Sequence, residues 1–252
     1  MKRENLLGYL DTLLQPGKWR DYCPNGLQVE GRPEIRKIIA GVTASQLLLD
    51  CAVDRESDAV LVHHGYFWKG EDSRLTGLKR QRLKTLLSHD INLIAFHLPL
   101  DAHPELGNNA QWAKAMGWEK TGHFGEQEIG WIGHAANTDD AILSVAQWQD
   151  RLTQALQRTP LLIGDAHKPV RRIAWCSGGA QDYFADAIDA GADLYVTGEV
   201  SEPCTHLARE SGVAYLAAGH HTTERYGIRA LATHLRETQG LDCTFIDLDN
   251  PI

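Results

Sequence analysis

The sequence has no apolar run that approaches the ~20 residues a helix needs to cross a bilayer. Its first ten residues, MKRENLLGYL, are interrupted by Glu4 and Asn5 before the apolar core of a signal peptide is complete. We therefore expect neither a membrane span nor an export signal, and we predict a soluble, cytoplasmic protein.

Cysteine is scarce and scattered. The five cysteines are odd in number, and no two of them form a C-x-x-C pair. A zinc–thiolate site needs tighter clustering, and a disulfide framework needs an even count in a smaller chain. We interpret the cysteines as reduced and mostly buried.

An excess of positive charge is also missing, because the formal net charge is −8. This charge disfavours a general affinity for nucleic acid. The chain also lacks a P-loop and a glycine-rich dinucleotide fingerprint. One local basic cluster remains, for which a solvated helix face is favoured over an anion-binding patch. It consists of Lys79, Arg80, Arg82 and Lys84.

Short apolar runs alternate with amphipathic stretches over most of the 252 residues. This alternation predicts an α/β protein whose parallel strands are joined by right-handed crossovers. The expected strands are residues 37–42, 58–62, 91–96, 172–176, 193–197, 213–218 and 241–247. The expected helices are residues 4–15, 45–54, 79–88, 107–116, 141–158, 180–190 and 203–210.

The order of elements in the first half returns in the second half at an offset of 135 residues, which pairs Ile38 with Ile173. Few residues are identical at this offset, so the order of elements is the stronger indication of a repeat. We predict two related α/β domains, at about 1–124 and 125–252. We expect them to be joined through the glycine-rich stretch at 120–140.

Histidine is the unusual residue type, with twelve in the chain. His63 and His64 follow a predicted strand, and Gly65 allows a sharp turn after them. Asp101 follows the next strand, and His220 follows the strand at 213–218. The carboxyl ends of parallel strands are where open α/β sheets place their ligands. We therefore expect these side chains to face one cleft between the domains.

Imidazole and carboxylate groups in this pattern indicate a metal site. His220 and Glu224 are four residues apart at the start of a helix and so share one face. With His63, His64 and Asp101 they make five ligands, too few for two separate coordination shells. We therefore expect Asp101 and Glu224 to bridge two divalent ions ~3.5–4 Å apart. Zn²⁺, Fe²⁺, Mn²⁺ and Ni²⁺ all suit such ligands. The alternative is that these residues only form hydrogen bonds at strand ends.

Six long segments resemble the Nif-three-like family, in its bacterial YbgI type, which is often labelled GTP cyclohydrolase I type 2. They are DYCPNGLQVEG (21–31), GVTASQ (41–46), VHHGYFWKGE (62–71), HLPLDAHPELGNNA (97–110), TGEVSE (197–202) and GHHTTERYGIRAL (219–231). The resemblance implies a Nif-three-like fold with a dinuclear metal site in the cleft between two domains. It also implies a ring-shaped homohexamer. The family's metal-ligand motifs match His63, His64, Asp101, His220 and Glu224 without substitution.

The label implies hydrolytic opening of the imidazole ring of GTP with release of formate. In that reaction a hydroxide held by the metal ions attacks the purine C8, and an acid protonates the departing nitrogen. His97 and His221 are candidates for that acid, or for residues that orient the metal ligands. A non-catalytic metal-binding ring or metal-handling protein needs the same ligands and remains the alternative function. DNA binding is a third hypothesis, which requires basic residues to line the hole of the ring.

Two further features have two interpretations each. The aromatic run from Tyr66 to Trp68 has the chemistry to stack on a base, although packing at a domain or subunit contact is favoured. Glu199 stands 135 residues after His64. It is either a carboxylate of the site or a cap for the following helix.

Overall fold

The computed structural model describes residues 1–137 and 142–252, so residue 141 of the helix expected at 141–158 lies outside the described residues. The chain forms two compact units. The first comprises Met1–Gly107 and Gly227–Asp249, and the second comprises Asn108–Tyr226 and Asn250–Ile252. The boundary expected near residue 124 falls inside the second unit.

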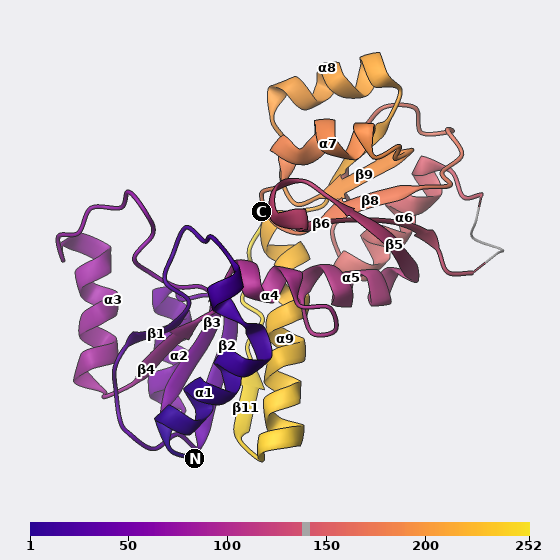
Figure 1. The fold of residues 1–252 in the computed structure, drawn as a ribbon. Helices are drawn as coiled ribbons and strands as arrows, with labels where there is room; N and C mark the ends of the chain where they lie inside the picture. Colours follow the sequence, from indigo (N-terminus) through magenta and orange to yellow (C-terminus); the bar gives the residue numbers. More distant parts are fainter. Residues whose placement is uncertain (138–141) are drawn as a thin grey trace. The chain divides into compact units, whose positions relative to one another are not determined.

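The first unit contains a five-stranded sheet in the order β1-β4-β3-β2-β11 (Figure 1). Strands β2, β3, β4 and β11 are parallel, whereas β1 pairs antiparallel with β4. Strand β1 was not predicted from the sequence. The strands are β1 (Gly26–Val29), β2 (Lys37–Thr43), β3 (Ala59–His64), β4 (Asn92–Ala95) and β11 (Asp242–Phe245). The helices are α1 (Arg3–Leu14), α2 (Gln46–Asp54), α3 (Gly77–Ser88), α4 (Leu98–Ala102) and the later part of α9 (His220–Gln239).

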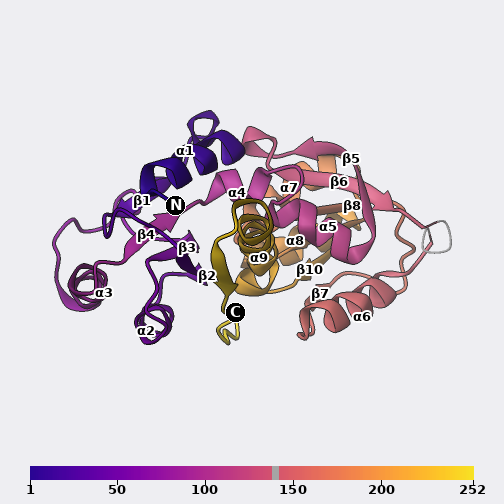
Figure 2. The same ribbon diagram turned by 90° about the horizontal axis from the view of Figure 1, so that it is seen from below.

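Alternate side chains of these strands enter two apolar layers, one on each face of the sheet. On one face Ile38 packs with Leu6 of α1 and Leu231 of α9. On the other face Ile39 packs with Leu48 of α2, and α3 adds Leu83 and Leu86. Figure 2 shows α1 and α2 on opposite sides of this sheet. Burial on both faces explains why the strands read as continuous apolar runs.

The second unit contains a six-stranded sheet in the order β5-β6-β8-β9-β10-β7 (Figure 1). Strands β8, β9 and β10 are parallel, and the other three pair antiparallel. The strands are β5 (Trp118–Phe124), β6 (Gly130–Ala135), β7 (Leu161–Ile163), β8 (Ile173–Cys176), β9 (Leu194–Thr197) and β10 (Ala214–Ala217). The helices are α5 (Asn108–Met116), α6 (Val145–Leu156), α7 (Phe184–Asp189), α8 (Glu202–Ser211) and the start of α9.

The glycine-rich stretch at 120–140 is not a linker over its described residues, because β5 and β6 form an antiparallel hairpin of the second sheet. A Cβ atom at Gly133 would lie 1.8 Å from the main-chain oxygen of Glu119. At Gly130 a Cβ atom would lie 2.5 Å from the ring of Phe124. These glycines permit close approach of neighbouring atoms inside the hairpin. Sequence alone does not distinguish glycines of this kind from those of a flexible linker.

The repeated order of elements is present. In each unit a strand, a helix and a second strand follow one another, and the two strands are parallel neighbours. The pair Ile38–Ala59 in the first sheet corresponds, at the offset of 135 residues, to the pair Ile173–Leu194 in the second. The two strand pairs therefore have the same register.

Candidate metal centre

The first cluster of candidate ligands lies at the carboxyl edge of the first sheet. His63 and His64 are the last two residues of β3, so the expectation that they follow the strand is wrong. The strand continues because Thr43 of β2 pairs with His64. The two rings nevertheless lie close together, with centroids 4.6 Å apart. His63 is fully buried, and His64 is partly exposed.

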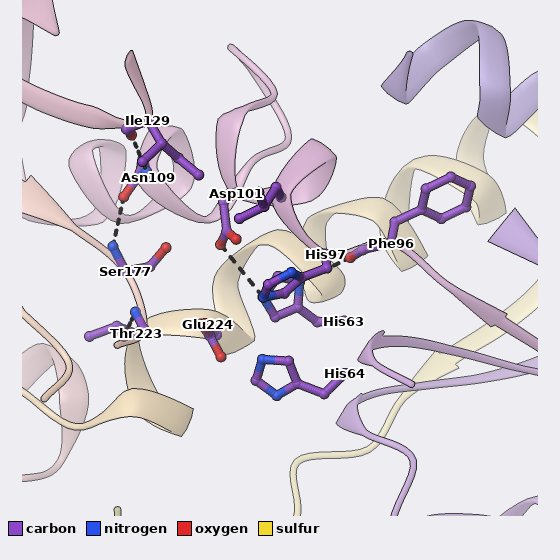
Figure 3. A network of polar contacts seen from close by, with 12 residues as sticks. His63, His64, Phe96, His97, Asp101, Asn109, Ile129, Ser177, Thr223 and Glu224 are labelled. Atoms are coloured by element: carbon purple, nitrogen blue, oxygen red, sulfur yellow. Dashed lines mark hydrogen bonds and ion pairs between the residues drawn. The ribbon is translucent and has the colours of Figure 1, made fainter. Parts of the chain in front are cut away.

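Hydrogen bonds fix which nitrogen of His63 carries a proton. Its Nδ1 lies 2.9 Å from the carbonyl oxygen of Phe96, which only accepts, so Nδ1–H donates there. The other nitrogen, Nε2, lies 3.6 Å from Oδ1 of Asp101, which α4 carries. In a neutral imidazole this places a nitrogen lone pair opposite a carboxylate. Figure 3 shows both contacts. Two electron donors face one another, an arrangement that a cation stabilises.

His97, at the start of α4, completes this cluster. Its ring centroid lies 5.1 Å from that of His63 and 5.7 Å from that of His64. One ring nitrogen of each of these three histidines lies within 4.8 Å of the others. Trp68 packs edge-on against His97, with ring centroids 5.0 Å apart.

His97 is held by a buried carboxylate. Its Nδ1 lies 2.7 Å from Oδ1 of Asp21, whose side chain is only 4% exposed. Burial acts to raise the pKa of Asp21, but hydrogen bonds from His97, Asn25 and the main chain of Tyr22, with the charge of His97, lower it to about 2. Asp21 is therefore ionised at neutral pH and orients the His97 ring. Asp21 was not predicted from the sequence as a residue of the site.

The second cluster is built from the second unit, where α9 begins with His220. Its Nδ1 lies 2.6 Å from Oε1 of Glu199, and its Nε2 lies 3.1 Å from Oε2 of Glu224. Glu224 is 3% exposed. Burial lowers the pKa of His220, but hydrogen bonds and charge from Glu224 and Glu199 outweigh burial and raise it to about 9. The imidazole therefore holds a proton at neutral pH when no metal is bound, and a metal ion at Nε2 would replace that proton.

Of the two interpretations of Glu199, the geometry supports a carboxylate of the site, because it orients a candidate ligand histidine. The residue before α8 is Ser201 rather than Glu199. For His221 the structure records a main-chain contact. Its main-chain N–H donates to the main-chain oxygen of Ile252 at 3.1 Å. Its ring belongs to no cluster of three or more potential metal ligands within residues 1–137 and 142–252.

A glycine after β8 leaves room for the Glu224 carboxylate. A Cβ atom at Gly178 would lie 2.2 Å from Oε1 of Glu224 and 3.3 Å from Nε2 of His220. The residue has φ +70, a conformation that favours glycine. Its N–H donates to Oγ1 of Thr223, and its carbonyl oxygen accepts from Oγ1 of Thr197. The loop is thus shaped around the carboxylate.

A buried asparagine fixes the residue next to this glycine. Oδ1 of Asn109 accepts from the main-chain N–H of Ser177 at 2.9 Å, and its Nδ2 donates to Ile129 at 3.0 Å (Figure 3). The main-chain oxygen of Asn109 also accepts from the indole of Trp175. The paired asparagines at 108–109 are the sequence signal from which this role could be predicted.

The three aromatic residues at 66–68 have different surroundings. Tyr66 is buried, and its hydroxyl donates to the main-chain oxygen of Ala44. Phe67 lies under the ammonium group of Lys79, which also pairs with Glu71 at 3.2 Å. Trp68 is partly exposed beside His97 and His64. Packing therefore accounts for the first two residues, and only Trp68 lies beside the candidate ligands.

The donor sets of both clusters fit a divalent transition metal. Each contains imidazole and carboxylate groups, and each has a histidine whose Nδ1 is held while its Nε2 faces a carboxylate. Gly178 further leaves space beside Glu224 that a larger residue would fill.

None of the helices among residues 1–137 and 142–252 has the length and apolar character that a membrane span requires.

Comparison with known proteins identifies the family to which this architecture belongs. The model of the Duf34/NIF3 family (NGG1p interacting factor 3) matches residues 1–251. The chain belongs to this family.

Its relatives are similar over nearly their whole length. A protein of Pseudomonas aeruginosa, named GTP cyclohydrolase 1 type 2 homolog, is 52% identical, with 96% of this chain and 95% of the relative covered. A Yersinia pestis protein of the same name is 52% identical over the whole of both chains. A solved structure described as protein ybgI, of unknown function, is 49% identical and covers both chains completely, with a TM-score of 0.95.

Proposed function

We propose that this protein binds two divalent metal ions per chain and is a metal-dependent hydrolase of the kind named in its relatives. The proposed ligands are His63, His64 and Asp101 of the first unit and His220 and Glu224 of the second unit. The observation that carries the proposal is the repeated motif of a histidine with a held Nδ1 and an Nε2 opposite a carboxylate. Sites of this kind suit Fe²⁺, Zn²⁺, Mn²⁺ or Ni²⁺.

Carboxylates with two oxygens are the groups in this set that can bridge two ions. Asp101 and Glu224 are both buried, which strengthens their attraction for cations. When bound, two such ions lower the pKa of a water molecule and so supply a nucleophile at neutral pH. In each cluster the carbonyl or carboxylate that holds Nδ1 raises the basicity of Nε2 as a ligand atom.

We take GTP as the proposed substrate because the relatives are named GTP cyclohydrolase 1 type 2 homolog. In this reaction one water adds at C8 and a C8–N bond breaks, which opens the imidazole ring to a formamide. A second water then hydrolyses the formamide to formate and an amine. His97 is the residue proposed to hold and deliver a proton, because Asp21 fixes its Nδ1–H and leaves Nε2 for exchange. Trp68, beside His97, is the aromatic surface proposed to receive the purine.

The test measures formate release from GTP and metal content on the same samples after anaerobic loading with Fe²⁺ or Zn²⁺. Wild type should bind close to two ions and release formate. Glu224→Gln should lose both, because an amide bridges metal ions poorly and carries no balancing charge. A single tightly bound ion that Asp101→Ala leaves unaffected would reject the bridged pair.

The matched control is Glu202→Gln. Glu202 forms a similar i, i+4 contact with His206 at 2.8 Å, but its side chain is 79% exposed. That variant should keep both ions and full activity. Two ions without formate release would refute the hydrolase while retaining the metal centre, and would favour the metal-handling alternative.

A homohexamer is also proposed, on the family resemblance. Three leucines on and before α3 are exposed and available for a subunit contact, and the basic residues of α3 flank them. They are Leu75, Leu78 and Leu87, which are 55%, 69% and 62% exposed. Light scattering on the wild type and on Leu78→Asp checks this proposal, since the variant should form smaller particles.

A further inference from the structure

A cavity of about 670 Å³ lies wholly within the second unit, next to the carboxylate that orients His220. Its polar wall includes Glu199, Arg158 and Thr159, and its apolar wall includes Leu161, Val200 and Ala217. This volume is within the range of small-molecule sites. Oε1 of Glu199 is already engaged by Nδ1 of His220, so Arg158 is the charged group of the wall that remains to attract a ligand.

Arg158 forms no ion pair with a carboxylate of the described residues. Its Nη1 donates instead to the main-chain oxygen of Pro251. Its side chain runs beside Gly219, where a Cβ atom would lie 3.2 Å from Nε of the arginine. Gly219 directly precedes the metal-ligand candidate His220, so the guanidinium group lies next to the start of α9.

The segment 250–252 returns to this place and presents oxygen atoms to it. The Pro251 oxygen accepts from Arg158, and the Ile252 oxygen accepts from the main-chain N–H of His221 at 3.1 Å. Ile252 also lines the cavity, yet its side chain is 59% exposed. The segment is therefore held mainly through its main-chain oxygens, and burial adds little to its attachment.

We propose that this cavity is an anion subsite, and that the segment 250–252 occupies it as an internal competitor. Arg158 binds the phosphate or carboxylate oxygens of a small molecule whose apolar body rests on Leu161, Val200 and Ala217. A planar guanidinium group with several N–H donors suits such oxygens. The ligand must displace the Pro251 oxygen from Arg158, so anion binding and release of the segment are coupled.

This inference deepens the proposed function, on which it rests for the statement that the ligand is a substrate. It assigns the substrate's anionic group to Arg158, beside Glu199 and His220. Binding of an anion by Arg158 is a separate property, because none of the groups involved is a proposed metal ligand. The two proposals therefore fail independently.

Calorimetric titration of metal-free protein with inorganic pyrophosphate tests the subsite without any contribution from metal chemistry. Removal of residues 250–252 should tighten pyrophosphate binding about tenfold, since the competing hydrogen bonds are lost. Arg158→Gln in the shortened chain should abolish the gain. The control is Arg209→Gln, an exposed arginine of α8 whose substitution changes the net charge equally and should leave binding unchanged.

Hydrogen exchange at the His221 main-chain amide supplies a second readout. Removal of the segment should speed its exchange, and pyrophosphate added to the full chain should do the same by releasing Ile252. Titrations with acetate and with orthophosphate distinguish carboxylate from phosphate as the preferred anion. Equal pyrophosphate affinity in the full and shortened chains, or equal effects of Arg158→Gln and Arg209→Gln, would overturn the proposal. So would absence of binding in a shortened chain that unfolds at the wild-type temperature.

Discussion

Replacing Gly178 by alanine should remove metal from the second cluster while leaving the fold in place. The added Cβ atom would lie 2.2 Å from Oε1 of Glu224. Non-bonded carbon and oxygen atoms need roughly 3 Å or more, so the carboxylate must move by about 1 Å. Metal–oxygen bonds tolerate a departure of only about 0.2 Å. We therefore expect Gly178→Ala to lose the ions that Glu224 binds.

A second glycine of the same unit provides the matched control. Gly212 has φ +71, nearly the same as the φ +70 of Gly178, but a Cβ atom there would have nothing within 4 Å. Both alanine variants pay the cost of a left-handed residue, about 1–2 kcal/mol. Only Gly178→Ala also disturbs a carboxylate. The difference between the two variants thus isolates the metal site from backbone strain.

The assay is metal content by elemental analysis, together with the free energy of unfolding from urea denaturation of metal-free protein. Gly212→Ala should lose about 1–2 kcal/mol of stability and keep the wild-type number of ions. Gly178→Ala should lose a comparable amount of stability and most of its metal. If both variants retain the same number of ions with equal affinity, Glu224 is not a ligand and the reasoning fails.

Three further outcomes are expected. Glu199→Gln should weaken metal binding about tenfold, measured by competition with a chromophoric chelator, because a neutral amide holds the His220 imidazole less strongly; unchanged affinity would show that Glu199 does not act through the metal ligand. Asp21→Asn should lower the free energy of unfolding by about 2 kcal/mol at pH 7, because the folded pKa of about 2 lies below the ordinary 3.8. Since the folded pKa is depressed, this stabilisation is present above pH ~4 and disappears as the pH falls through about 2; a difference between variant and wild type that persists at pH 2 would contradict it. Trp68→Ala should keep the metal content and mainly raise KM for GTP, since the indole lies beside His97; a fall in kcat alone would argue against stacking on the purine.

Much of the parallel core was predictable, because strands buried on both faces read as apolar runs. Strands β2, β3, β8, β9 and β10 were all expected close to their observed bounds. The antiparallel strands were not. β1 and β7 are short, and the hairpin of β5 and β6 carries polar residues and glycines that resemble a linker. Such strands are defined by their partners rather than by their own composition.

Most candidate ligands followed from local sequence. His63 and His64 end a strand, and His220 and Glu224 have a helical spacing, whereas Asp101 lies within α4. His220 and Glu224 are four residues apart in one helix, and their 3.1 Å contact is therefore nearly a property of the sequence. What holds the ligands was decided by tertiary structure. Asp21 contacts His97 across 76 residues, and the carbonyl of Phe96, the residue after β4, fixes His63.

The sequence by itself indicated which side chains are candidate metal ligands and which strands and helices carry them. Tertiary structure decided the protonation of their ring nitrogens, the space around Glu224 and the location of the second carboxylate on His220. The physical reason is the distance along the sequence over which each effect acts. Helix and strand periodicity act over a few residues, so spacing alone places neighbouring ligands on one face. Hydrogen-bond partners, burial and steric room come from residues far apart in the chain, as Gly178 and Glu224 show.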